Sequence, residues 1–262
     1  GLPQIFLAQL LLKHSFFREV ITSRDMALDL GLSQHLVEQL LEYLKNQNYL
    51  YGSPRDGITS QTHLTMRMRY SLTDKGRAHA EQCVESNRYV GPAPVPLEDY
   101  WDWVEAQSIH QVQVSQQRLQ EVFEDYVVPP GLFNKIGPAI NSGRSIFLFG
   151  PSGNGKTLMA TCIGRAFEDP VYIPYALYLY GQVVQLYDEV NHQPAPPRPD
   201  APAHDPRWVL CRRPMVVAGG EMTEDALELK FNPILKYYEA PHQLRANNGV
   251  FIIDDFGRQK IT

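Results

Sequence analysis

The segment SIFLFGPSGNGKT, residues 145–157, decides the fold of this chain. Its first five residues form a continuous apolar run, which is typical of a strand buried on both faces of a parallel sheet. The next eight residues match the pattern G-x-x-x-x-G-K-[ST], and residues 158–167 continue with a helical pattern. A strand, a glycine-rich loop and a helix in this order predict an α/β fold with a phosphate-binding loop.

The residue types in this loop suit the phosphates of a nucleotide. Glycines at 150, 153 and 155 let the backbone wrap closely around phosphate oxygens, with its N–H groups turned inward. Lys156 can reach the β- and γ-phosphates, and the Thr157 hydroxyl can bind Mg²⁺. The helix that begins at Lys156 points its positive dipole end at the same charge. The candidate phosphate-binding residues are Gly150, Pro151, Ser152, Gly153, Asn154, Gly155, Lys156, Thr157 and Leu158.

A second apolar run, residues 250–253, ends in the two carboxylates Asp254 and Asp255. Open α/β sheets bind their ligands at the carboxyl ends of the strands. Asp254 is therefore a candidate Mg²⁺ residue together with Thr157, and Asp255 a candidate general base that polarises the attacking water. Lys156 and Asp255 are the candidate catalytic residues. For both aspartates the alternative of a turn that only closes a strand stays open.

With both motifs in place, residues 98–262 resemble the front part of AAA+ ATPases, with residues 98–143 as linker helices. The segment NNGVFIIDDFGRQ, residues 247–259, is similar to the Asp-Asp form of the Walker B motif in bacterial helicase loaders, transposition ATP-binding proteins and replication initiators. It also resembles members with an inserted hairpin, such as magnesium chelatase and MoxR-like proteins. The resemblance implies ATP and Mg²⁺ as cofactors, a parallel sheet flanked by helices, and a homo-oligomeric ring.

Two departures from the family pattern bear on activity. Asp255 stands where the family more often has glutamate, and its side chain is one methylene shorter. The family pattern continues after Walker B with two strands, a polar sensor, an arginine finger and a helical lid. The chain has eight residues after Asp254, so we expect it to be part of a longer protein and to hydrolyse ATP weakly or not at all by itself.

Residues 1–90 predict a small α+β domain. Three helices are expected, the second capped by Thr22 or Ser23 and the third by Ser33, followed by a strand pair. Thr73 is the expected cap of a fourth helix. The closing segment YSLTDKGRAHA, residues 70–80, resembles the winged helix-turn-helix domains of many bacterial regulators.

The charge of this domain leaves its partner open. Residues 1–90 contain ten basic and nine acidic side chains, and the third helix has Glu38 and Glu42 against only Lys45. Such a helix is poorly suited to the phosphate-lined major groove of DNA. The candidate contacts to DNA or to a partner protein are Arg55, Arg67 and Arg69. Docking to a protein and contact with DNA both remain open.

The rest of the chain predicts a linker and several further elements. Residues 91–97 hold alternating prolines, which predict an extended linker between the two domains. Helices are expected over 98–126, 132–140 and 234–246, a tyrosine-rich hairpin over 171–187 and a strand over 208–218. The hairpin is either sheet core or an insertion that grips a substrate or a neighbouring subunit.

Composition narrows the class of protein. The chain has 262 residues, of which 44% are hydrophobic, so wholesale disorder is excluded. A net charge of −5 gives no general attraction to nucleic acid, and three scattered cysteines predict reduced thiols rather than a disulfide framework. The longest apolar stretch, residues 5–12, is too short to span a membrane. We expect a soluble, cytoplasmic protein.

Three functions fit the sequence. The first is an ATPase that couples ATP binding and hydrolysis to remodelling of a protein partner, with the winged helix as adaptor. The second is a DNA-directed ATPase of the helicase-loader or transposition-helper class. The third is a nucleotide-dependent switch with little turnover. Each of them depends on the same phosphate-binding loop.

Overall fold

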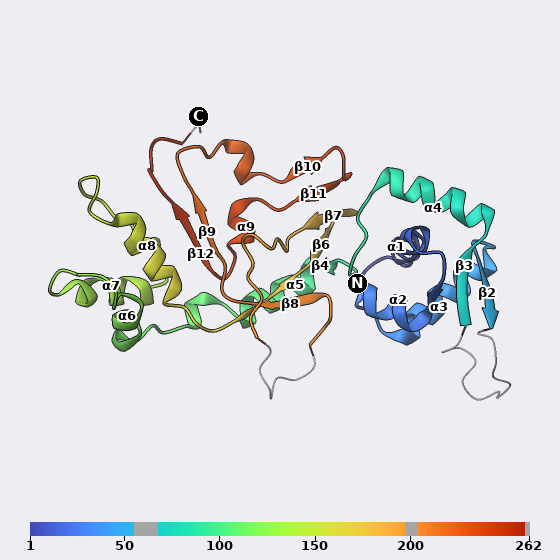
Figure 1. The fold of residues 1–262 in the computed structure, drawn as a ribbon, viewed down its shortest axis with the longest axis horizontal. Coiled ribbons are helices and arrows are strands. Elements are labelled where there is room, and N and C mark those ends of the chain that lie inside the picture. The colour runs from blue at the N-terminus through green and yellow to red at the C-terminus, as the bar shows by residue number, and fades with distance from the viewer. Residues whose placement is uncertain (55–67, 197–203, 260–262) are drawn as a thin grey trace.

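A computed structural model describes residues 1–54, 68–196 and 204–259. The chain has a mixed α/β architecture in which parallel and antiparallel strand pairs occur together. Figure 1 shows helices α1–α4 with strands β2 and β3 at one end of the molecule, most of the other strands in the middle, and helices α6–α8 at the far end. The strand pairing is therefore not that of the wholly parallel sheet predicted from the sequence.

The first part of the chain contains the four expected helices. Its elements are α1 (Gln4–Phe17), β1 (Ile21–Thr22), α2 (Ser23–Leu30), α3 (Gln34–Asn46), β2 (Leu50–Pro54), β3 (Met68–Leu72) and α4 (Asp74–Ser86). The three strands form one antiparallel sheet in the order β1-β3-β2. Side chains of Thr22, Ser33 and Thr73 accept hydrogen bonds from the first turns of α2, α3 and α4, which confirms these predicted caps. Strand β1 was not expected, since two residues are too few for an alternating pattern.

The segment LTDKG, residues 72–76, contains a glycine at a position where a side chain would not fit. A Cβ atom on Gly76 would lie 1.9 Å from the carbonyl oxygen of Tyr49, so only glycine allows α4 to approach the start of β2 this closely. The Thr73 N–H donates to the same carbonyl oxygen over 3.0 Å, and the Thr73 hydroxyl donates to the Asn48 carbonyl over 2.7 Å. Helix α4 is thus fixed to the backbone of the hairpin at its first turn.

Two titratable side chains are buried at the end of α1. Lys13 is 3% exposed, and its Nζ donates to the carbonyl oxygen of Asn87 over 3.0 Å and to the side-chain oxygen over 3.3 Å. The next residue, His14, donates from Nε2 to the Gly91 carbonyl over 3.3 Å. Burial lowers the pKa of Lys13 to about 8 and lowers the pKa of His14 as well. Both side chains thus bind the backbone of the segment that follows α4.

We expect the buried Lys13 to make stability rise with pH. The pKa of Lys13 is about 8 in the folded state and 10.5 in the unfolded state. Between pH 8 and pH 10.5 the unfolded chain therefore binds more protons than the folded chain, and stability rises with pH. The free energy of unfolding of the parent, relative to Lys13→Met, should increase by about 2 kcal/mol from pH 7.5 to pH 10. Urea unfolding of both proteins at the two pH values measures this difference. The tyrosines are present in both proteins, so the effect of their titration on stability cancels in the comparison. Equal differences at both pH values would show that the pKa of Lys13 is normal.

A five-stranded sheet forms the middle of the molecule, in the order β10-β11-β7-β6-β4. Its strands are β4 (Val95–Pro96), β6 (Ala176–Leu179), β7 (Gln182–Gln185), β10 (Lys230–Asn232) and β11 (Tyr237–Glu239). Strands β6 and β7 form the hairpin predicted around Gly181, where Tyr180 and Gly181 adopt φ values of 47° and 84°. Beside it, β5 (Val171–Pro174) pairs antiparallel with β8 (Trp208–Cys211).

The proline-rich segment 91–97 joins the first part to this sheet. It is extended as predicted, but its residues 95 and 96 form β4, which pairs in parallel with β6. Val95 is fully buried, and the Ala93 N–H donates to the Leu30 carbonyl over 2.7 Å. Prolines are tolerated here because β4 is the edge strand of the sheet. The segment predicted as an extended linker is therefore packed against the rest of the chain.

The remaining elements lie between the central sheet and the far end of the molecule, where α8 follows the predicted phosphate loop. They are α5 (Leu97–Ala106), α6 (Gln116–Val122), α7 (Leu132–Asn141), α8 (Lys156–Arg165), α9 (His242–Arg245), β9 (Met215–Ala218) and β12 (Val250–Ile253), with short 3₁₀ helices at Ile109–Gln111 and Glu224–Leu227. Strands β9 and β12 pair in parallel. Leu119, Ile136 and Ile163 form a separate small core between α6, α7 and α8. The helices at this end thus have their own apolar support.

Three predicted elements differ from the structure. Residues 145–149 do not form a strand, because none of the described strands pairs with them. Their aromatic side chains are exposed, Phe147 to 69% and Phe149 to 83%. The helix expected over 234–246 is instead a turn with Lys236 at a φ of 58°, followed by β11 and the short α9. The strand expected over 208–218 is interrupted before Met215 by Pro214, which has no N–H to donate.

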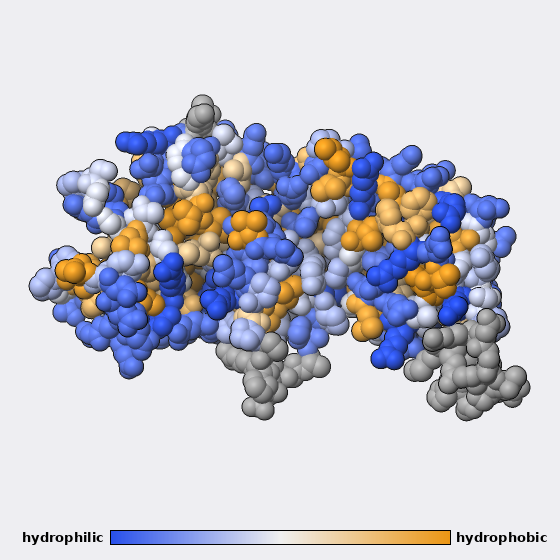
Figure 2. Space-filling view, viewed as in Figure 1, coloured by the Kyte–Doolittle hydropathy of each residue, from blue (hydrophilic) through white to orange (hydrophobic). Residues whose placement is uncertain are grey.

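The outer surface is largely polar on the face seen in Figure 2, where hydrophilic residues surround separate apolar patches. None of the helices in the described part of the chain has the length and apolar character that a membrane crossing requires. The structure thus agrees with the sequence on the absence of a membrane-spanning helix within these residues.

Candidate functional site

The glycine-rich loop at 150–155 connects residues 145–149 to α8. Gly150, Gly153 and Gly155 have φ values of 146°, 83° and 71°, a region that favours glycine. A Cβ atom on any of them would meet no other atom within 4 Å. These glycines are therefore required by the backbone conformation and not by lack of space. All residues of the loop are exposed, so a ligand can reach its backbone N–H groups.

Lys156 is the first residue of α8 and turns back over the loop. Its Nζ donates to the carbonyl oxygens of Gly150 and Pro151 over 3.1 and 2.9 Å. The ammonium group thus lies against the same loop that would surround a phosphate. The free N–H groups at the start of the ten-residue helix face this region as well. Both features favour a bound anion.

The two predicted Mg²⁺ residues come together. The Thr157 hydroxyl donates to Oδ2 of Asp254 over 2.8 Å, although the residues are 97 positions apart in the chain. Asp254 directly follows β12, and its N–H donates to the Ala218 carbonyl over 2.8 Å, which continues the pairing with β9. A hydroxyl and a carboxylate are oxygen ligands of the kind that Mg²⁺ prefers. They can supply two of its ligands, with water and phosphate oxygens as the others.

This arrangement is not a cage made wholly of protein side chains. Among the described residues, no group of three or more His, Cys, Asp or Glu side chains could hold a metal ion. Mg²⁺ commonly binds through one or two protein oxygens together with substrate phosphates. The geometry around Thr157 and Asp254 therefore suits a metal that arrives with a nucleotide.

Asp255 lies beside this pair, and its backbone N–H donates to Oδ1 of Asp254 over 3.0 Å. It adopts a left-handed conformation with a φ of 51°, and its carboxylate lies 3.6 Å from the Arg258 guanidinium in an exposed ion pair. Its side chain is 63% exposed, so water can approach it. The structure thus links Asp254, and not Asp255, to Thr157.

Gln259 closes the turn after β12, a role that the sequence did not reveal. Its side-chain NH₂ donates to the Asp254 carbonyl over 2.8 Å and to the Asp255 carbonyl over 3.2 Å. Its side-chain oxygen accepts from the Gly257 N–H over 2.8 Å. Gln259 therefore fixes the backbone that carries both aspartates. A glutamine six residues after the strand is too common a pattern to predict this.

Arg213 connects the elements on which the site depends. It is 8% exposed and forms a two-pronged ion pair with Asp169, with Nε–Oδ1 and Nη2–Oδ2 distances of 3.1 and 2.5 Å. Its Nη1 donates to the carbonyls of Gln107 and Asn248 over 3.1 and 2.6 Å. The contacts join β9, the segment after α8, the end of α5 and the residues before β12. Sequence reasoning did not find this role, because each partner is distant in the chain.

The candidate contacts of the first part are only partly described. Arg69 lies on β3 and is exposed. Arg55 and Arg67 fall outside the described residues. The grouping of these three arginines on one surface therefore stays a prediction.

Exposed aromatic rings lie next to the phosphate loop. Phe147 is 6.2 Å from Phe149 and 6.0 Å from Phe256, measured between ring centroids. The glycine-rich loop, Lys156 and the Thr157–Asp254 pair thus form one exposed site with an apolar border. A scan of the sequence against protein-family models finds no match, and a search among curated proteins finds none either.

Proposed function

We propose that this chain is an AAA+-type ATPase that couples ATP binding and hydrolysis to the remodelling of a protein partner. The observation that carries the proposal is the hydrogen bond between Thr157 and Asp254, since it unites the ends of two distant sequence motifs. A homo-oligomeric ring is part of the proposal, with an arginine from a neighbouring subunit completing each site. Arg213 and Arg245 are unsuitable for that task because they form ion pairs with Asp169 and Asp188 in their own chain.

The residues of the site fit ATP and Mg²⁺. Loop N–H groups and the start of α8 would hold the phosphates, and Lys156 would exchange its two loop carbonyls for phosphate oxygens. Thr157 and Asp254 would hold the metal, which stabilises negative charge on the phosphates. Asp255 would accept the proton of the attacking water, which its exposure allows. Bound ATP supplies the phosphoanhydride bond that is cleaved.

The first part of the chain supports the role of an adaptor. Its helices and its three-stranded sheet follow each other as in winged helix-turn-helix domains, which favours that assignment. Its buried leucines also belong to the same core as Ala176, Val183 and Tyr237 of the central sheet. A partner that binds the first part would therefore be coupled mechanically to the rest of the chain.

A nucleotide-dependent switch is the second candidate function. The ion pair between Asp255 and Arg258 favours it, because the carboxylate would have to leave this contact before it could bind the attacking water. A DNA-directed ATPase has less support: α3 carries Glu38 and Glu42, and these two residues contribute after burial to the raised pKa of the neighbouring Tyr70. We therefore favour a protein partner over DNA.

Titration with ATP in the presence and absence of Mg²⁺ tests the proposed function. Asp254→Ala should weaken ATP binding in Mg²⁺ by about tenfold, roughly 1.4 kcal/mol, and leave binding in a chelator unchanged. Asp255→Asn is the matched control for binding: it should bind ATP like the parent and hydrolyse it more slowly. If Asp254→Ala binds ATP in Mg²⁺ as tightly as the parent, the metal role is wrong.

A further inference from the structure

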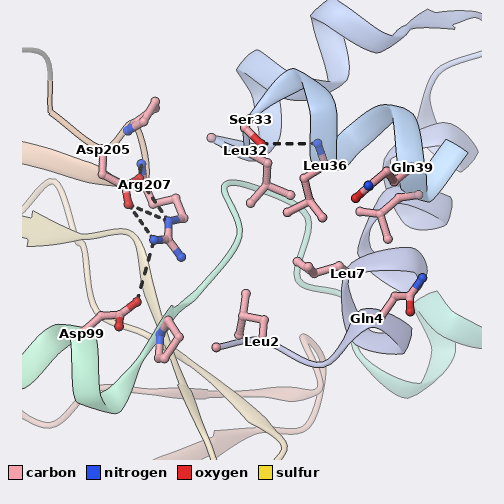
Figure 3. Close-up of a pocket in the computed structure, with 15 residues that line it drawn as sticks. Leu2, Gln4, Leu7, Leu32, Ser33, Leu36, Gln39, Asp99, Asp205 and Arg207 are labelled. Atoms are coloured by element: carbon pink, nitrogen blue, oxygen red, sulfur yellow. Dashed lines mark hydrogen bonds and ion pairs between the residues drawn. The ribbon is translucent and has the colours of Figure 1, made fainter.

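A large cavity lies away from the phosphate loop, between the first part of the chain and α5. It has a volume of about 860 Å³. Figure 3 shows one wall built from leucines of α1, of α3 and of the turn before α3, with Leu7, Leu32 and Leu36 turned towards the cavity, and Arg207 with two carboxylates on the other wall. The cavity is therefore a groove with one apolar and one charged side.

The two walls meet in a fixed position. Gly31, at the end of α2, has a φ of 62°, and a Cβ atom on it would lie 2.9 Å from Cγ of Arg207 and 3.1 Å from its backbone nitrogen. The hydrogen bond from Ala93 to Leu30 ties the same end of α2 to the segment before β4. These contacts hold the two walls of the groove together.

The charged wall is negative. Nη2 of Arg207 lies 2.6 Å from Asp205 and 4.0 Å from Asp99, so its single positive charge faces two carboxylates. The negative charge continues along α5, whose ten residues include four acidic side chains and no basic one. The exposed acids of this helix are Glu98, Asp99, Asp102 and Glu105. This surface repels phosphate groups and attracts lysine and arginine.

We propose that the groove binds an amphipathic segment of a partner protein, with apolar side chains on the leucine wall and basic side chains along α5. A groove that accepts the apolar face of such a segment is a common mode of peptide recognition. Trp101, which is 61% exposed on α5, can stack with a basic side chain beside the acidic row. The inference extends the proposed function by naming the chemistry of the partner, and it does not require ATP hydrolysis.

The test uses a synthetic helical peptide with leucines on one face and lysines on the other, and its twin with glutamates in place of the lysines. Binding to the full chain, without nucleotide, is followed by fluorescence anisotropy. The lysine peptide should bind at least tenfold more tightly than the glutamate peptide. Neutralising the acidic row with Glu98→Gln and Asp102→Asn should weaken binding about tenfold, and Gln39→Lys, on the exposed rim of the groove, should weaken it similarly.

Helix α4 offers matched controls, since it does not line the groove. Glu81→Gln together with Glu85→Gln, and separately Gln82→Lys, make the same changes of charge at exposed positions of α4 and should leave binding unchanged. Equal binding of both peptides, equal losses in the control variants, or competition by duplex DNA would overturn the proposal. So would a concentration-dependent dimer that Gln39→Lys dissociates, because a second copy would then cover the groove. ATP titration of the same samples separates this result from failure of the proposed function.

Discussion

Replacing Lys156 by alanine is expected to lower the affinity for ATP by about a hundredfold. The ammonium group already lies against the loop that would surround the phosphates, 2.9 Å from the Pro151 carbonyl oxygen. A hydrogen bond to a charged group contributes up to about 3 kcal/mol, which corresponds to roughly a hundredfold in affinity. Isothermal titration with ATP and Mg²⁺ measures this loss.

Lys135→Ala is the control for the Lys156 variant. Lys135 is an exposed lysine on α7, so its removal changes the net charge by the same amount without touching the loop. It should bind ATP like the parent. Unchanged affinity in Lys156→Ala would contradict the assignment of residues 150–157 as a phosphate loop, and with it the proposed function.

Replacing Arg213 by alanine is expected to lower the free energy of unfolding by about 3 kcal/mol. Removal of one partner of a buried ion pair costs roughly 3–5 kcal/mol. Here the side chain of Arg213 is 3% exposed and that of Asp169 is 40% exposed, so Asp169 regains some hydration and the lower value applies. The carbonyls of Gln107 and Asn248 lose their donor as well.

Arg212→Ala provides the comparison for this variant. The two arginines are neighbours in sequence, but Arg212 is exposed. Its replacement should change stability by no more than about 0.5 kcal/mol. Urea unfolding of both variants measures the difference. Equal stabilities would mean that Arg213 does not hold β9, α5 and the residues before β12 together.

Local signals in the sequence were sufficient for part of the fold. Thr22, Ser33 and Thr73 cap helices as expected, because a cap depends on residues three positions apart. The hairpin around Gly181 also depends on a short segment. For the site, the spacing of glycines and the end of an apolar strand were enough to predict that Thr157 and Asp254 lie together.

Other features depend on partners that are distant in the chain. Residues 145–149 have the composition of a buried strand, yet none of the described strands pairs with them and Phe149 is exposed. A strand forms only where a neighbouring strand shares its hydrogen bonds, and the composition of one segment does not reveal that neighbour. The ion pair of Arg213 joins residues 44 positions apart and has no local pattern. The prolines at 94 and 96 correctly predicted extended chain. The contact of this segment with Leu30 and its pairing with β6 depend on the tertiary structure, so the prolines alone could not predict them.

Strand β4 has a consequence for how force would pass through the molecule. A flexible tether would leave the first four helices free to reorient relative to the central sheet. Strand β4 instead pairs with β6 of that sheet, and the next residue begins α5. The wall of the groove on α5 is therefore attached directly to the central sheet, so a change in the position of that sheet would change the shape of the groove.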